Sequence, residues 1–292
     1  MAQSAGTGKA SLARFSNQKF LLLRALRAAG WLRWADRAKF FAMQAGARSF
    51  NRRFEQQHPD FAVPPEHLAF DALNHVDWTR YRATGLQHAQ MFARIIRDQT
   101  PATAALAVLE WGCGPGRLIR HLPDLLADHP LQLCGADYNP ESIAWCRANL
   151  PGTEFVENAL NPPLPLAEGR FDVVYNFSVF THLSQAVQLA WAEELKRVLK
   201  PGGLLICTTH GDGYRHLLAS GAEQQAYAAG QVVEQGRYRE GRKWFLAVHP
   251  PAFVRSRLLA GWDSVQPVAT RPEDGIEQDV WIARKPLTNP AA

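Results

Sequence analysis

The sequence predicts an α/β fold, in which a mostly parallel sheet is covered by helices on both faces. Two observations lead to this prediction. From residue 105 onward short apolar runs alternate with helical patterns. The stretch VLEWGCGPGRL (108–118) contains the end of the first run and the glycine-rich turn that follows it. Such alternation is typical of parallel sheets, because each parallel connection needs a crossover, usually a helix.

The N-terminal third is expected to be helical and separate from this core. Residues 1–11 are small and polar and predict a disordered start. A helical extension is expected over residues 12–100, because good helix formers dominate much of it. Its expected parts are two helical pieces over 12–54 divided near Gly30, a Pro-containing linker at 55–70, and a helix at 77–99.

The core is expected over residues 101–286, with a tail at 287–292. Apolar runs predict strands at 107–111, 131–136, 154–157, 171–177 and 203–209, with helices around 117–127, 140–149 and 184–199. Residues 211–243 break this rhythm with Gly, Ala, Gln and charges, and are interpreted as an insertion or lid. A strand at 244–248, a helix at 251–260 and a strand at 278–284 complete a set of seven strands.

The composition is that of a globular enzyme. Of the 292 residues, 47% are hydrophobic and 20% are charged, and no apolar run approaches the length of about 18 residues that a membrane span requires. The cysteines form no CxxC pair and fall on separate predicted elements: Cys113, Cys134, Cys146 and Cys207. This argues against a zinc site or a disulfide framework and for a reducing, cytoplasmic setting.

Positive charge is concentrated at the N-terminus. Residues 1–60 hold 11 Lys/Arg and 3 Asp/Glu, whereas residues 61–292 hold 21 and 24. This asymmetry argues against a uniformly basic nucleic-acid surface. Aromatic residues interleave with the charges at Trp31, Trp34, Phe40 and Phe41. The arm is interpreted as a cap over a substrate pocket, with a membrane-surface helix and a mitochondrial transit peptide as alternatives.

The glycine turn departs from the dinucleotide fingerprint. A G-x-G-x-x-G pattern would place its third glycine at Arg117 or at Ile119, depending on the starting glycine. The pattern present is E-x-G-x-G-x-G, from Glu110 to Gly116. An NAD-dependent oxidoreductase, which shares the sheet, is therefore disfavoured.

Four segments in the same order resemble class I S-adenosylmethionine-dependent methyltransferases. They are VLEWGCGPG (108–116), GADYNPESIAWCRANL (135–150), FDVVYNFSVFTHL (171–183) and LKRVLKPGGLLICTTHG (195–211). The resemblance covers about residues 105–212. The chain also resembles a bacterial branch of this family that is associated with polysaccharides and secondary metabolites. It implies a Rossmann-like seven-stranded fold ending in a reversed hairpin, and S-adenosyl-L-methionine as cofactor. The undamaged first motif disfavours a non-catalytic binding module.

The resemblance also assigns cofactor contacts. It places the glycine turn against the methionine and ribose, Glu110 near the ammonium, and Asp137 at the ribose hydroxyls. Asn158 stands where the family often has an Asp at the adenine amine. The expected contacts are Glu110, Gly112, Cys113, Gly114, Gly116, Asp137, Tyr138, Asn158, Ala159, Asn176 and Phe177. For Phe177 a core position is an equal alternative.

Three further residues are left open between two roles. Arg117 either reaches the cofactor carboxylate or is a solvated residue of the first helical turn. Tyr81 or Arg82 either closes over the cofactor or packs on the sheet, and packing is favoured.

The reaction is expected to be in-line methyl transfer to a small molecule or a glycan, with a hydroxyl oxygen favoured over an amine nitrogen. A base matters for a hydroxyl, and the candidates in order are His210, His249 (with Asp279 or Gln278 as partner) and His182. No carboxylates cluster after the fourth strand, so no metal is expected. Asn161-Pro162-Pro163 precedes that strand and does not match the base-flipping motif, so no nucleic acid is expected. Nothing in the sequence indicates an oligomeric state.

Overall fold

The computed structural model describes residues 31–102, 104–235 and 239–287. The predicted disordered start and the first helical piece, up to Gly30, lie outside the described residues, as does most of the tail. Within the described part, no helix is long and apolar enough to cross a membrane. All four cysteines are buried and free of disulfide bonds.

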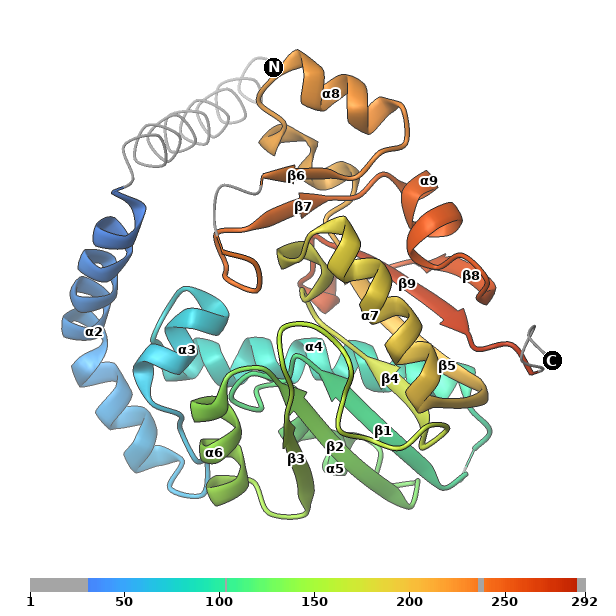
Figure 1. Cartoon of the computed structure of the whole chain (residues 1–292). Helices are drawn as coiled ribbons and strands as arrows, with labels where there is room; N and C mark the ends of the chain where they lie inside the picture. The colour runs from blue at the N-terminus through green and yellow to red at the C-terminus, as the bar shows by residue number, and fades with distance from the viewer. Residues whose placement is uncertain (1–30, 103, 236–238, 288–292) are drawn as a thin grey trace, which may run out of the picture.

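Seven strands form one sheet in the order β3-β2-β1-β4-β5-β9-β8 (Figure 1). The parallel strands are β1 (Leu106–Trp111), β2 (Leu131–Asp137), β3 (Thr153–Glu157), β4 (Phe171–Tyr175) and β5 (Leu199–Thr209). β9 (Asp279–Arg284) is antiparallel to β5, and β8 (Asp263–Val268) is antiparallel to β9. The strand order reverses between β1 and β4, which is where open α/β sheets bind ligands.

Helices cover both faces of this sheet. On one face lie α4 (Trp78–Gln99), α5 (Leu122–Leu125) and α6 (Pro140–Asn149), and on the other lie α7 (Gln185–Val198) and α9 (Pro251–Phe253), which continues as a π-helical turn (Val254–Leu258). β5 shows the division, because Leu204 and Ile206 belong to one core cluster, whereas Leu205 and Cys207 belong to the other. A buried strand therefore supplies apolar side chains to both layers.

Local caps fix the turns that lead into two of these helices. The Asp77 side chain accepts the N–H of Arg80 (3.0 Å) at the start of α4. The Asn139 side chain accepts the N–H of Glu141 (3.0 Å) at the start of α6, where Pro140 takes the first helical position. The turn between β2 and α6 is thereby held in one conformation.

Two helices precede the core. α2 (Leu32–Gln57) runs along one side of the molecule, with α3 (Glu66–Leu73) between it and the sheet (Figure 1). The buried side chain of Asn51 anchors α2, since it donates to the carbonyl of Val76 (2.8 Å) and accepts the N–H of Trp78 (3.1 Å).

The predicted insertion forms a small unit beside the sheet. It contains a 3₁₀ turn (Asp212–Leu217), α8 (Gly221–Ala228) and β6 (Val233–Gln235), and β6 pairs with β7 (Leu246–Val248) in a separate two-stranded sheet. Other 3₁₀ turns span Ile119–His121, Phe180–His182 and Pro272–Asp274.

Three sequence-based expectations need correction. The strand expected at 244–248 is β7 and belongs to the small sheet, and the seventh strand of the main sheet is β8, which was not predicted. The helix expected over 117–127 consists of a 3₁₀ turn and the four-residue α5. The expected linker at 55–70 is partly helical, because α2 continues to Gln57 and α3 begins at Glu66.

Candidate functional site

A cavity of about 890 Å³ lies beyond the carboxyl ends of β1, β2 and β4. Small-ligand pockets span about 300–1,000 Å³, so this cavity is near the upper end of that range. The turns after β1 and β2 form one side, and the segments after β3 and β4 form another. Residues of α2, α3 and the segment 239–244 close the remaining side.

Three glycines shape the turn after β1. Gly112, Gly114 and Gly116 have φ values of 79°, 50° and 64°, in the region that favours glycine. A Cβ at Gly112 would overlap Val179, and a Cβ at Gly116 would overlap Leu150. At Gly114 the nearest atom to such a Cβ is 4.0 Å away. Gly112 and Gly116 therefore serve the packing of the chain, whereas Gly114 leaves open space that a ligand can occupy.

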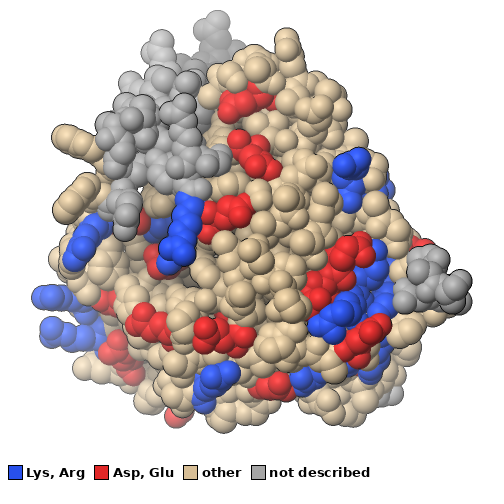
Figure 2. Space-filling model, viewed as in Figure 1, with Lys and Arg blue, Asp and Glu red and all other residues tan. Residues whose placement is uncertain are grey.

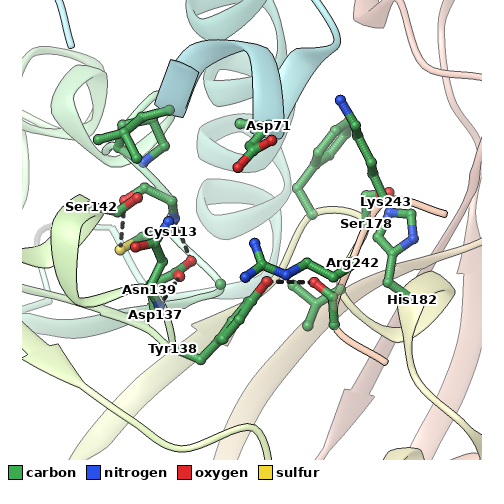
Figure 3. Close-up of a pocket in the computed structure, with 18 of the residues that line it drawn as sticks. Asp71, Cys113, Asp137, Tyr138, Asn139, Ser142, Ser178, His182, Arg242 and Lys243 are labelled. Carbon is green, nitrogen blue, oxygen red and sulfur yellow. Dashed lines mark hydrogen bonds between the residues drawn. The ribbon is translucent and has the colours of Figure 1, made fainter. Parts of the chain in front are cut away.

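Asp137 joins this turn to the end of β2. Its Oδ2 accepts the N–H of Gly114 (2.7 Å) and its Oδ1 accepts the N–H of Asn139 (2.8 Å; Figure 3). Burial raises the pKa of the carboxyl, and these backbone hydrogen bonds oppose the rise. Each oxygen retains a further lone pair, so the carboxylate can still accept hydrogen bonds from a ligand hydroxyl.

Glu110 is also buried and lines the cavity. Its Oε2 accepts the N–H of Ile119 (2.9 Å) and the hydroxyl of Tyr175 (2.9 Å). Burial raises the pKa of Glu110 to about 8, against the lowering effect of the Tyr175 hydrogen bond. An uncharged acid therefore prevails at neutral pH, and a cation in the cavity would favour its ionised form.

Arg117 is a buried cation on the cavity wall. The residue is 5% exposed and lines the cavity. Both of its terminal nitrogens lie 3.2 Å from Nδ1 of His88, and its guanidinium carbon lies 5.4 Å from the Phe177 ring centroid. Burial lowers its pKa to about 10. Within the described residues it makes no ion pair. The alternative of a solvated first-turn residue is therefore wrong, and the side chain is placed to receive an anionic group.

Asn158 carries an unused acceptor. Its Nδ2 donates to the carbonyl of Ala159 (2.7 Å), while its buried Oδ1 has no hydrogen-bond partner within the described residues. Both residues line the cavity. A buried polar atom without a partner is costly, so Oδ1 is suited to accept from a ligand amine.

The segment 239–244 forms the opposite wall and is tied to the core by hydrogen bonds. The Tyr138 hydroxyl donates to the carbonyl of Gly241 (2.6 Å; Figure 3), and the N–H of Gly241 donates to the carbonyl of His182 (2.9 Å). Lys243 forms an ion pair with Asp36 of α2 (2.9 Å). Gly241 has φ 75°, and a Cβ there would lie 2.7 Å from Leu160. This wall was not predicted in detail, because its parts are distant in sequence.

Of the three candidate histidines, only His182 lines the cavity. Its Nδ1 lies 2.8 Å from the carbonyl oxygen of Phe245, which can only accept, so Nδ1 carries the proton and Nε2 keeps its lone pair. Burial lowers the pKa of His182, so its ring is neutral at pH 7.

The surroundings of His210 and His249 argue against ranking these two ahead of His182 as candidate bases. His210 is buried with its ring stacked on Tyr214 (centroids 3.9 Å apart) and its Nε2 lies 3.4 Å from Nε2 of Gln278. His249 is fully buried, and the hydrogen-bond partner of its Nε2 is Oε1 of Gln188 (3.1 Å), not the expected Asp279 or Gln278. Neither lines the cavity.

Ser178 is a cavity residue that the sequence analysis missed. It follows β4 with φ 61°, a backbone conformation unusual for a residue with a side chain. Gln278 holds it there, because its Nε2 donates to the Ser178 hydroxyl (2.8 Å) while its Oε1 accepts from Thr208 (2.6 Å). The SVF sequence carries no signal for this strain, which depends on a contact 100 residues away.

The structure brings most of the expected cofactor contacts together. Those that line the cavity are Glu110, Gly112, Cys113, Gly114, Asp137, Tyr138, Asn158, Ala159 and Phe177. Gly116 and the fully buried Asn176 do not line it. Tyr81 packs behind the turn, where its hydroxyl donates to the carbonyl of Pro115 (3.0 Å), and Arg82 lies near His58. The buried Tyr81 therefore packs in the interior, whereas Arg82 is exposed and does not pack on the sheet.

Known proteins share the core of this chain. A family model described as a methyltransferase domain matches residues 109–207. A probable S-adenosylmethionine-dependent methyltransferase of Mycolicibacterium smegmatis is 38% identical over 35% of this chain and 37% of its own length. A ubiquinone biosynthesis O-methyltransferase of Cereibacter sphaeroides is 32% identical over 54% of this chain and 61% of its own. The chain thus spans less than two thirds of these relatives.

A solved structure gives the same picture at the level of the fold. The S-adenosylmethionine-bound amino pentose methyltransferase of Micromonospora echinaspora aligns with a TM-score of 0.51. The alignment covers 71% of this chain and 95% of that one, at 18% sequence identity. The similarity supports a Rossmann-like methyltransferase fold.

Proposed function

Because the chain belongs to the class I S-adenosylmethionine-dependent methyltransferase family, we propose that it is an enzyme that transfers a methyl group from S-adenosyl-L-methionine to an acceptor in the cavity. The observation that carries the proposal is the set of unused binding groups around Gly114. Open space over Gly114, the free acceptor of Asn158 and the unpaired cation of Arg117 all face one cavity.

These groups fit the chemistry of the cofactor. Asp137 would accept the ribose hydroxyls, Asn158 the adenine amine, and Arg117 would bind the carboxylate. Glu110, whose pKa is raised to about 8, would ionise beside the ammonium. When bound, the cofactor supplies an electrophilic methyl group on a sulfonium. Gly116 and Asn176 do not line the cavity and are left out of this set.

His182 is proposed as the base that accepts the acceptor's proton. Phe245 fixes its tautomer through Nδ1, and burial keeps the ring neutral, so Nε2 can accept a proton. Ser178 also lines the cavity, and its hydroxyl is oriented by Gln278. We expect Ser178 to position the acceptor. The remaining rate enhancement comes from holding the reacting atoms in line.

The acceptor is proposed to be a hydroxyl oxygen of a small molecule or glycan. A neutral base is most useful for a hydroxyl, and the related protein of Cereibacter sphaeroides is named an O-methyltransferase. The transfer is proposed to be metal-independent, because within the described chain no three His, Cys, Asp or Glu side chains gather to hold an ion. An amine nitrogen is the second candidate, since an amine that is already neutral needs no base.

The direct test measures S-adenosylhomocysteine formation with a panel of phenols, sugars and amines. Turnover that depends on the added acceptor supports the proposal, and turnover with hydroxyl compounds but not amines supports O-methylation. If the purified protein binds S-adenosylhomocysteine and methylates only amines, the hydroxyl assignment is overturned and the family activity stands.

A further inference from the structure

α2 has two different apolar faces. Its inner face is built into the protein, because Phe54 is buried and Phe40 packs edge-on against Phe70 of α3 (centroids 5.2 Å apart). Its outer face carries large aromatic side chains that nothing described covers. Trp31, Trp34 and Phe41 are 66%, 75% and 51% exposed. With the exposed Ala38 and Ala45 they recur at a spacing of three or four residues, which places them on one side of the helix.

The charges on this side are of one sign. Arg48 and Arg52 continue the aromatic stripe, are exposed, and make no ion pair within the described chain. Figure 2 shows positive side chains at the edge of the molecule where α2 lies.

Both acidic residues of α2 are bound by the rest of the protein. Asp36 pairs with Lys243, and Glu55 accepts from Nε1 of Trp78 (3.1 Å). They leave the outer face without negative charge. The preceding residues 1–30 add five Lys/Arg and no Asp/Glu.

We propose that the outer face of α2 binds the surface of an anionic lipid bilayer. Tryptophan and phenylalanine insert at the boundary between headgroups and acyl chains, and arginines beside them attract anionic headgroups. A second copy of the chain fits less well. A two-fold contact would bring the unneutralised arginines of both copies into one interface without any acidic partner from α2, which is costly.

This contact would bring the cavity to the membrane. Asp36 and Phe40 line the cavity from the same helix whose other side carries Trp34 and Phe41. The cap and the membrane-surface helix, which the sequence presents as alternatives, are therefore compatible because they use opposite faces of α2. The proposal stands independently of methyl transfer, since it rests on the helix surface alone.

The test is co-sedimentation of the full chain with vesicles of phosphatidylcholine, alone or mixed with phosphatidylglycerol. We expect at least about tenfold tighter binding to the mixed vesicles, weakening with salt. Trp34→Ala with Phe41→Ala should reduce that binding about tenfold or more. Arg48→Gln with Arg52→Gln should abolish most of the lipid preference. The matched control is Phe50→Ala, which removes an aromatic residue that is 65% exposed but lies on another side of the helix.

The outcomes separate this proposal from the others. Equal binding to both vesicle types, no binding to either, or an equal loss in the Phe50→Ala control would overturn it. So would a dimer in light scattering that becomes a monomer in Trp34→Ala with Phe41→Ala, because the face would then bind a second copy. Calorimetric binding of S-adenosylhomocysteine by the same variants verifies that the fold and the cavity are retained.

Discussion

The Nδ1 atom of His182 lies 2.8 Å from the carbonyl oxygen of Phe245, and this contact settles which ring nitrogen carries the proton. It joins the 3₁₀ turn after β4 to Phe245, which directly follows the segment 239–244 that forms the opposite wall of the cavity. The same segment is held by the Tyr138 hydroxyl at Gly241 (2.6 Å). The proposed base is thus positioned by parts of the chain that lie far apart in the sequence.

Replacing His182 is expected to affect the chemical step. His182→Gln should lower kcat about 100- to 10,000-fold with a hydroxyl acceptor, while the affinity for S-adenosylhomocysteine stays within about twofold. Because the pKa of His182 is lowered from 6.5, wild-type activity should be constant above pH 6.5 and fall only at more acidic pH. Steady-state kinetics above and below pH 6.5 measures both the kcat of the variant and the pH profile of the wild type. The exposed His216→Gln is the control, and a kcat loss of similar size there would contradict the assignment.

The three glycines of the turn should respond differently to alanine. Gly114→Ala places a Cβ in open space, so it should cost about 1 kcal/mol of stability from its positive φ but weaken S-adenosylhomocysteine binding at least tenfold. Gly112→Ala and Gly116→Ala should lose about 1–3 kcal/mol more, because their Cβ atoms meet Val179 and Leu150. Urea unfolding and calorimetry measure the two quantities. Equal stability losses at all three positions would show that Gly114 is not the open one.

Buried neutral histidines should make the fold sensitive to acid. Burial lowers the pKa of both His210 and His249 from 6.5 to about 3. Unfolded chains therefore bind more protons below pH 6.5, so this contribution to stability is complete above pH 6.5 and is lost as pH falls towards 3. Glu110 acts oppositely, since its raised pKa favours folding below pH 4.5 and this contribution is lost as pH rises to about 8.

A variant isolates one of these groups. Each histidine contributes a slope of about 1.4 kcal/mol per pH unit to the free energy of unfolding. His249→Gln should reduce the slope between pH 6 and pH 4 by about that amount, in urea unfolding followed by fluorescence. An unchanged slope would mean that His249 is already protonated in the folded protein.

The ion pair between Asp36 and Lys243 should couple α2 to the cavity wall. Both side chains are mostly buried, at 16% and 17% exposed. A double-mutant cycle with Asp36→Asn and Lys243→Gln should give a coupling energy of about 1 kcal/mol, at the upper end for such pairs. The reference cycle uses Glu193 and Lys196, which pair at 2.8 Å with Glu193 68% exposed. A coupling no larger than the reference would indicate that this ion pair does not couple α2 to the cavity wall.

Most of the parallel strands could be predicted because they are apolar runs that alternate with helical patterns. The seventh strand could not, because β8 (DSVQPV) is an edge strand with mostly exposed side chains and a proline, so it lacks a periodic apolar signal. A strand was predicted at the more apolar segment 244–248 instead, and this segment contains β7, which pairs with β6.

That most of the expected cofactor contacts line one cavity could also be predicted from the sequence, since they lie at or directly after the ends of β1, β2 and β3. The ranking of the three candidate bases could not be predicted. His210 and His249 also follow strands, but their side chains are buried against Tyr214 and Gln188. The burial of Arg117 likewise depends on His88 and Phe177, which belong to other elements. Contacts across the fold decide these cases, and spacing does not report them.

Calorimetric titration of the purified chain with S-adenosylmethionine, S-adenosylhomocysteine and NAD measures whether the cavity binds the methyltransferase cofactor. We expect micromolar binding of the two sulfur nucleosides, no binding of NAD, and at least tenfold weaker binding in Asp137→Ala and Asn158→Leu. Asn149→Ala, which removes an exposed amide on α6, should bind as the wild type does. Binding of NAD, or no binding of either sulfur nucleoside, would show that the proposed cofactor is wrong.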